Sequence, residues 1–64
     1  MAISIGDTID IYWANTGRHG LGTVEKVLVA MVTLRITRPS AHTISVMADR
    51  LRETAESHHW KLDL

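Results

Sequence analysis

Hydrophobic and polar residues alternate near the start of the chain with the two-residue period of a β-strand. After Gly6-Asp7, a pair typical of a turn, every second residue of Thr8–Trp13 is apolar. Successive side chains of a strand point to opposite faces, so Ile9, Ile11 and Trp13 share one face. The pattern predicts a strand over 8–13 with this face in the core.

A polar, glycine-containing segment follows this strand. Asn15 to Gly20 contains residues that adopt positive φ angles readily, so it predicts a loop that carries Arg18 and His19. Backbone amides and basic side chains in such a loop can cradle a phosphate, but the spacing matches neither a P-loop nor a dinucleotide fingerprint. A hairpin loop is the simpler interpretation, and a second strand is expected to begin near Leu21.

The fourteen residues from Val24 to Thr37 contain no Gly, Pro, Asn or Asp. A straight strand of that length would span ~46 Å, whereas a compact chain of this size has a diameter of roughly 28 Å. Val24 and Val27 also differ by an odd number of positions, so they cannot share one face of a regular strand. We therefore expect two strands with a bulge or tight bend between Lys26 and Ala30.

Two further strands and a short helical turn are expected in the second half of the chain. Val32–Thr37 alternates strictly, Pro39 marks a turn, and Thr43–Val46 predicts the next strand. Met47–Leu51 is expected to form one helical turn that leads into a fifth strand. The alternative is a longer C-terminal helix that Asp49 caps and that carries Leu51, Ala55 and Leu62 on one face, because residues 48–59 are good helix formers.

Length and cysteine content limit how the chain can stabilise itself. Its 64 residues are expected to form one domain, with a core over 5–54 and a C-terminal extension over 55–64. A domain of this size usually needs disulfides, a metal or self-association. The chain has no cysteine, which excludes disulfides and thiolate metal sites and favours a homo-oligomer.

Charge and hydropathy argue against a membrane partner. Seven basic residues balance seven acidic ones, so no overall field attracts a membrane surface or nucleic acid. The first residues lack the features of a signal peptide. The longest apolar run, Val27–Val32, is far shorter than the ~20 residues that span a bilayer. We expect a soluble, cytoplasmic protein.

The order of these elements resembles an SH3-like small barrel. The segments that carry the resemblance are IGDTIDIYW, GLGTVEKV, VTLRIT, and TISV followed by MADRL. A Gly-Asp opening, a Gly-Thr-Val second strand and a short turn before a final leucine are similar to KOW, Tudor and related barrel modules, over roughly residues 5 to 52. The resemblance implies an all-β, five-stranded SH3-like barrel with a short helical turn.

The same outline resembles the type II dihydrofolate reductases, which are small barrels assembled as tetramers around one pore. That family lines its pore with a Val-Gln-Ile-Tyr stretch, which corresponds to Thr43-Ile44-Ser45-Val46 here. Ile44 and Val46 occupy the Gln and Tyr positions, so the groups that hold cofactor and folate are missing. The resemblance implies the fold and self-association without the activity.

No other catalytic constellation stands out. Nucleophilic or acid–base chemistry needs a base close to a nucleophile, with a third group that orients the base. Serine, histidine and aspartate all occur, but not in the context of a nucleophile elbow. We expect a protein that is not an enzyme and that needs no cofactor.

The apolar turn after the second strand is the leading candidate for a binding surface. So many apolar residues cannot all be buried in a small barrel, and an exposed apolar patch usually marks a contact with another chain. The expected protein-contact residues are Val27, Leu28, Val29 and Met31. The leading hypothesis is a binding or assembly module that contacts a protein partner or a second copy of itself.

The runner-up hypothesis is nucleic-acid binding on the outer face of the strands. If the aliphatic residues of the third and fourth strands point inward, hydroxyl and arginine side chains point outward and offer donors to phosphate. The residues of this set are Thr33, Arg35, Arg38, Thr43, Ser45, Arg50 and Arg52. The chain has few aromatic side chains for stacking on bases.

Two adjacent histidines, His58 and His59, precede Trp60 near the C-terminus. Neighbouring side chains diverge on a strand and lie ~100° apart on a helix, so the pair is not expected to hold one metal ion. We expect a polar tail without a metal, in which Trp60 and Leu62 cover an open end of the core.

Overall fold

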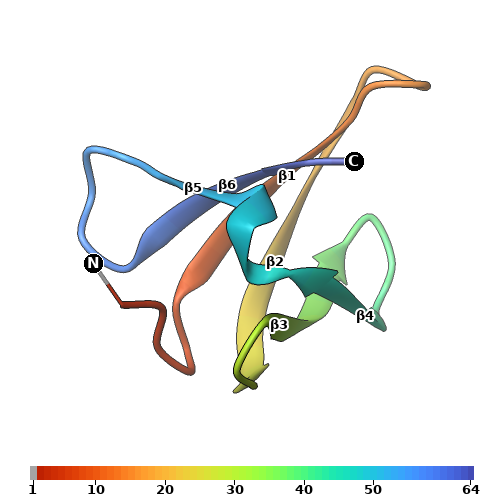
Figure 1. The fold of residues 1–64 in the computed structure, drawn as a ribbon. Helices are drawn as coiled ribbons and strands as arrows, with labels where there is room; N and C mark the ends of the chain where they lie inside the picture. The colour runs from red at the N-terminus through yellow and green to blue at the C-terminus, as the bar shows by residue number, and fades with distance from the viewer. Residues whose placement is uncertain (1) are drawn as a thin grey trace.

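The alternating segments form the strands of one curled sheet in the computed structural model, which describes residues 2–64. The strands are β1 Thr8–Trp13, β2 Arg18–Val27, β3 Met31–Arg38, β4 His42–Met47, β5 Leu51–Glu53 and β6 His59–Asp63. A short 3-10 turn, η1 over Ala48–Arg50, separates β4 from β5. Across the sheet the strands lie in the order β4-β3-β2-β1-β6-β5 (Figure 1).

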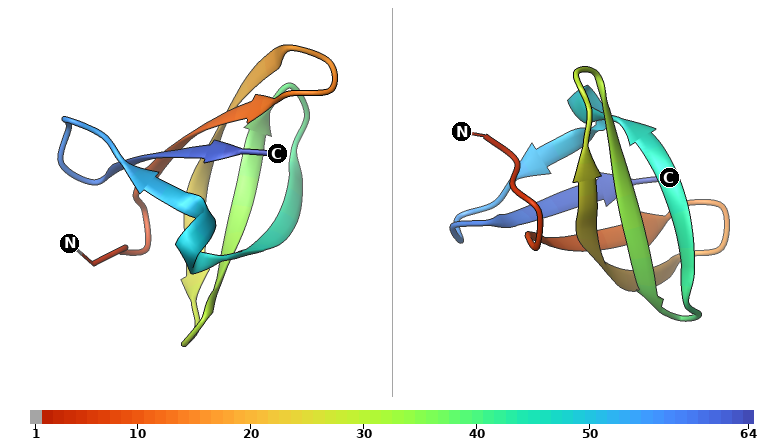
Figure 2. Two further views of the ribbon diagram at one scale, coloured as in Figure 1. Left: turned by 45° about the horizontal axis from the view of Figure 1, so that its top comes forward. Right: turned by 90° about the horizontal axis from the view of Figure 1, so that it is seen from below.

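The sheet curls into half a barrel (Figure 2). The buried side chains form the core on its concave face. Neighbouring strands pair antiparallel, except that β1 and β6 run parallel. The buried core side chains are aliphatic apart from one tryptophan: Ile9, Ile11, Val24, Val32, Leu34, Ile36, Leu51, Trp60 and Leu62. The predicted all-β class and the inward faces of the first and third strands are confirmed.

The expected strand number is wrong, and so is the alternative of a C-terminal helix. The sheet has six strands rather than five, and within residues 2–64 no α-helix forms over 48–59. Residues 55–64 also do more than extend a finished core, because they supply β6 between β1 and β5. The reason lies in His59–Asp63, whose buried Trp60 and Leu62 alternate with half-buried or exposed residues and complete the core beside β1. The short helical turn is confirmed as η1.

The chain reverses inside the apolar stretch, as predicted. β2 ends at Val27, residues 28–30 form the turn, and β3 begins at Met31. The Leu28 amide donates a hydrogen bond to the Met31 carbonyl over 2.8 Å, which closes the turn.

A bulge accompanies this turn. The pairing of β2 with β3 shifts between Val24 and Lys26, so the bulge lies just before the range in which it was expected. It places Val27 opposite Val32 and restores the alternation that the odd spacing from Val24 would otherwise break.

β2 begins earlier than expected, at Arg18 rather than near Leu21. The predicted loop residues Arg18 and His19 are therefore strand residues, and only residues 14–17 form the turn before them. Gly17 alone in this turn has a positive φ, of 69°.

Gly20 has a different role from the turn residue that the sequence suggested. It lies within β2, where the Trp13 ring and the Arg38 carbonyl pack directly against its backbone. A Cβ at this position would lie 2.6 Å from Cζ3 of Trp13. The missing side chain is what allows β1 and β2 to pack around the tryptophan.

We expect Gly20→Ala to lower the free energy of unfolding by about 1–3 kcal/mol, because the added methyl group overlaps the Trp13 ring. Gly22→Ala is the matched control in the same strand. Its nearest contact would be 3.1 Å, so the loss should be smaller. Urea unfolding of the three proteins measures the difference, and a Gly20→Ala protein as stable as wild type contradicts the prediction.

Candidate functional site

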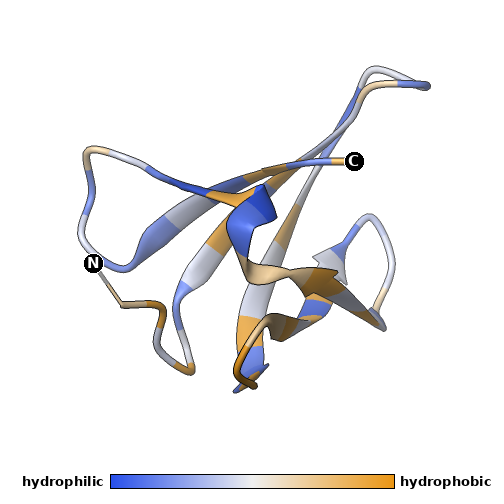
Figure 3. Cartoon of the chain, viewed as in Figure 1, coloured by the Kyte–Doolittle hydropathy of each residue, from blue (hydrophilic) through white to orange (hydrophobic). Residues whose placement is uncertain are grey.

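Exposed apolar side chains gather at the end of the β2–β3 hairpin, in a surface that we name the apolar tip. It consists of Val27, Leu28, Val29, Met31 and Met47. Val29 is fully exposed, and Leu28 keeps 51% of its surface exposed. Figure 3 shows the hydrophobic colouring at this turn and at the adjoining end of β4. The structure thus places the four predicted protein-contact residues, all exposed, in and beside one turn. Met31 points outward with Met47, whereas Val27 lies opposite the core residue Val32.

Met47 is the member of the apolar tip that sequence reasoning missed. It lies at the end of β4, directly opposite Met31 in β3. The Ala48 amide also donates to the Ala30 carbonyl over 2.9 Å, so the turn is bonded to the start of η1. The alternation of β4 could have revealed the outward position of Met47, but only the register with β3 brings it to the turn.

The outer face of β3 and β4 carries polar side chains, as predicted. Thr33 lies opposite Ser45, and their hydroxyl oxygens are 3.2 Å apart. Arg35 lies opposite Thr43, and its Nη1 is 4.0 Å from Oε1 of Glu25. Local partners therefore already engage part of the candidate nucleic-acid surface.

The other arginines of that candidate set lie elsewhere. Arg50, in η1, donates a hydrogen bond to the Asp63 carbonyl over 2.9 Å. Arg52 lies in β5, opposite Lys61 of β6, and Arg38 lies at the end of β3. β5 and β4 are at opposite ends of the strand order, and the three residues of η1 connect them. The sheet does not gather these arginines on the β3–β4 face.

Arg18 and His19 lie exposed at the start of β2 rather than in a phosphate-binding loop. His19 lies opposite Tyr12 of β1, and their ring centroids are 4.8 Å apart with planes tilted by 40°. This cross-strand ring pair accounts for the position of the histidine without a ligand.

The two adjacent histidines contact two different carboxylates. Nδ1 of His58 lies 3.0 Å from Oδ1 of Asp7, whereas Nε2 of His59 lies 2.7 Å from Oδ2 of Asp10. The predicted divergence of the pair is confirmed. Across residues 2–64, no three histidine or acidic side chains are grouped in a way that could hold a metal ion.

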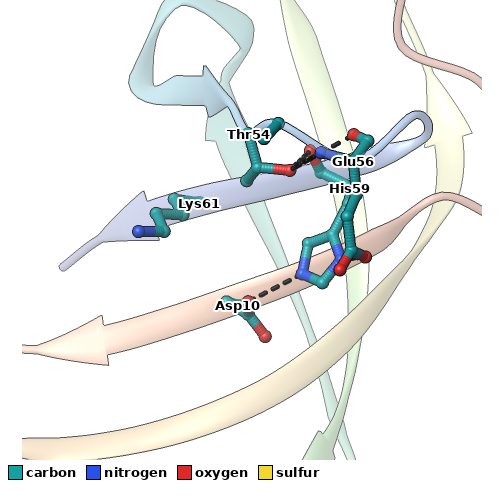
Figure 4. A pocket seen from close by; sticks show the side chains of 6 residues that line it. Asp10, Thr54, Glu56, His59 and Lys61 are labelled. Carbon is teal, nitrogen blue, oxygen red and sulfur yellow. Dashed lines mark hydrogen bonds and ion pairs between the residues drawn. The ribbon is translucent and has the colours of Figure 1, made fainter.

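His59 bridges two acidic side chains in a shallow hollow on the outer face (Figure 4). Besides its contact with Asp10, it places Nδ1 at 2.9 Å from Oε2 of Glu56. Only the protonated ring carries N–H groups on both nitrogens and can donate to both carboxylates. The hydrogen bond with Asp10, followed by that with Glu56, raises the pKa of His59 above its ordinary value of 6.5.

Asp7 is buried, and it joins the residues before β1 to β6. Its Oδ2 accepts hydrogen bonds from the Ser4 amide and from Nε1 of Trp60, each over 3.0 Å. Burial by itself would raise the pKa of Asp7. The bonds from Ser4 and Trp60, together with the nearby His58 ring, outweigh that effect and hold the pKa below its ordinary value of 3.8.

Comparisons with protein-family models, with curated proteins and with solved structures gave no significant match. In the part of the chain that the structure describes, no helix has the length and apolar character needed to cross a membrane.

We expect Asp7→Ala to lower the free energy of unfolding by about 1–3 kcal/mol, because the Ser4 amide and the Trp60 indole lose a buried acceptor. Asp49→Ala, which removes an exposed aspartate in η1, is the matched control.

In the wild-type protein, the stability that Asp7 contributes is complete above pH 3.8 and is lost as the pH falls through its lower folded pKa. Urea unfolding across acidic pH checks both effects. The same acid sensitivity in wild type and Asp7→Ala would argue against them.

The raised pKa of His59 has the opposite consequence for stability. Its contribution is complete below pH 6.5 and is lost as the pH rises through the higher folded pKa. The wild-type protein should therefore lose stability above pH 6.5, and Asp10→Asn should reduce that loss. Urea unfolding on both sides of this pH measures the effect, and NMR titration of the His59 ring reports its pKa directly. An unchanged His59 pKa in Asp10→Asn would rule out this carboxylate as the main cause.

Proposed function

We propose that the chain is a non-catalytic assembly module, built as an SH3-like small barrel, that associates with a second copy of itself through the apolar tip. The observation that carries the proposal is the grouping of five large apolar side chains, all exposed, at one end of the half-barrel. Apolar residues scattered singly on a surface are ordinary, whereas a contiguous group usually marks a contact with another chain.

The surroundings of the apolar tip support this proposal. Glu25, Lys26 and Asp49 are exposed and charged, and they lie next to the tip in sequence. An apolar centre with a polar rim is typical of protein–protein interfaces. Met31 and Met47 add flexible, polarisable side chains that adapt to the shape of a partner.

The SH3-like assignment rests on the order of the elements. η1 immediately precedes the buried Leu51, in agreement with the short turn before a final leucine in the resembled modules. The position of β6 between β1 and β5 goes beyond the five-stranded outline.

The nucleic-acid hypothesis receives less support than self-association. Arg50 and Arg52 belong to η1 and β5 rather than to the polar face of β3 and β4, and Arg35 already lies near Glu25. Nucleic-acid binding stays a prediction, and so does the absence of enzyme activity.

We expect the wild-type protein to sediment as a concentration-dependent oligomer and Leu28→Asp to sediment as a monomer, because a buried, unpaired carboxylate opposes the contact. Ile5→Asp is the matched control, since Ile5 is an apolar side chain outside the tip with 71% of its surface exposed. Unfolding curves establish that both variants are folded. A monomeric wild-type protein would contradict the proposed function, and so would a Leu28→Asp protein that associates as well as Ile5→Asp.

A further inference from the structure

β4 forms one edge of the sheet. Its only neighbour among residues 2–64 is β3, and no backbone hydrogen bond in this part of the chain reaches its other edge. In Figure 2, β4 runs along the outside of β3 before the chain turns into η1. Such an edge offers unpaired amide and carbonyl groups to another chain.

The register of β3 with β4 identifies these free groups. The hydrogen bond from the Ala48 amide to the Ala30 carbonyl places this pair at a bonded position of the ladder. Bonded and non-bonded pairs alternate in an antiparallel ladder, so Ile44 and Val46 direct their amide and carbonyl groups towards β3. The β4 residues whose backbone groups point to the free edge are Thr43, Ser45 and Met47.

The two edges of the sheet differ in how they resist pairing. β5 has only three residues and carries Arg52 and Glu53, and short, charged edge strands resist pairing with other chains. β4 has six residues and contains no proline, lysine, arginine or acidic residue. His42, at its first position, is its one titratable side chain. β4 therefore lacks the features that prevent an edge strand from pairing with another chain.

The side chains on the concave face of β4 are incompletely covered. Ile44 and Val46 pack against the core, but both stay half-buried, whereas the aliphatic core residues of the neighbouring β3 are fully buried. A strand added beyond β4 would cover them further. On the convex face, Met47 at the end of the same strand belongs to the apolar tip.

We propose that the free edge of β4 pairs antiparallel with β4 of a second copy of this chain, around a twofold axis at Ser45. In this register Ser45 lies opposite Ser45 of the second copy and Thr43 lies opposite its Met47. All of these residues have free backbone groups, which gives about six hydrogen bonds across the axis. This inference rests on the proposed self-association and adds the free edge of β4 as a second surface of contact beside the apolar tip.

The sequence of β4 suits a copy of itself. The register sets Ile44 opposite Val46 on the concave face, so each β-branched side chain covers its counterpart. No residue from Thr43 to Met47 is charged, so no like charges meet across the axis. A twofold contact of this kind closes after two chains and does not propagate into a filament.

Cysteine crosslinking tests the register, because the chain has no cysteine of its own. Opposed residues of a bonded antiparallel pair have Cα atoms about 5.5 Å apart, which is within the range of roughly 4.4–6.8 Å for a disulfide. We expect Ser45→Cys to form a disulfide-linked dimer under mild oxidation. Thr43→Cys is the matched control on the same face of β4, since the Cα atoms of its two copies would lie about 14 Å apart.

The Ser45→Cys dimer should form at least about tenfold faster than the Thr43→Cys dimer, because paired thiols have a high effective concentration. An equimolar mixture of Thr43→Cys and Met47→Cys should yield mainly the mixed dimer. Equal rates for Ser45→Cys and Thr43→Cys, or no disulfide in any variant, would overturn the pairing of β4.

Adding Leu28→Asp to the Ser45→Cys protein separates this inference from the role of the apolar tip. Fast crosslinking that survives Leu28→Asp supports β4 pairing and shows that the tip is not needed for it. A Leu28→Asp protein that becomes monomeric, together with slow crosslinking of Ser45→Cys alone, supports the tip and overturns the pairing of β4.

Discussion

The hydrogen bond from the Trp60 indole to the buried Asp7 carboxylate joins two residues 53 positions apart, and the arrangement of the sheet depends on it. β1 and β6 run parallel, so no hairpin can set their register. Asp7 sets it at the start of the pair, where the Thr8 amide also donates to the His58 carbonyl over 3.0 Å. On the opposite face, Asp10 holds His59. The carboxylates on either side of the first strand thus hold the last strand in place.

The insertion of β6 determines one of the two edges that the sheet presents. Because β6 occupies the place beside β1, β5 becomes one outer strand, and the other is β4. β6 also supplies Trp60 and Leu62 to the concave face and completes the core there. The apolar residues of the β2–β3 turn lie outside that core, so they remain available at the surface. The parallel pair thus completes the core and one side of the sheet, while β4 and the β2–β3 turn lie on its other side.

Local pattern predicted the first strand, the reversal within the apolar stretch and four of the five residues of the apolar tip. These features depend on residues close in sequence. The alternation of apolar and polar residues sets the inward face of a strand, and an odd spacing between apolar residues marks a turn even in a run without Gly or Pro. Met47, the burial of Asp7 and the dispersal of the arginines could not be predicted in the same way. Each depends on pairing between segments that are distant along the chain.

By itself, then, the sequence determined an all-β chain whose strands have an inward aliphatic face. It also determined a turn with more apolar residues than the small core can bury. Both follow from the period and composition of the side chains, which are local properties. Only the tertiary structure decided that the last residues form a strand inside the sheet rather than a helix or a tail. The helix formers of 48–59 favour a helix locally. Burial of Trp60 and Leu62 against β1, with the Asp7 acceptor in reach of the indole, outweighs that preference through contacts that form only in the folded chain.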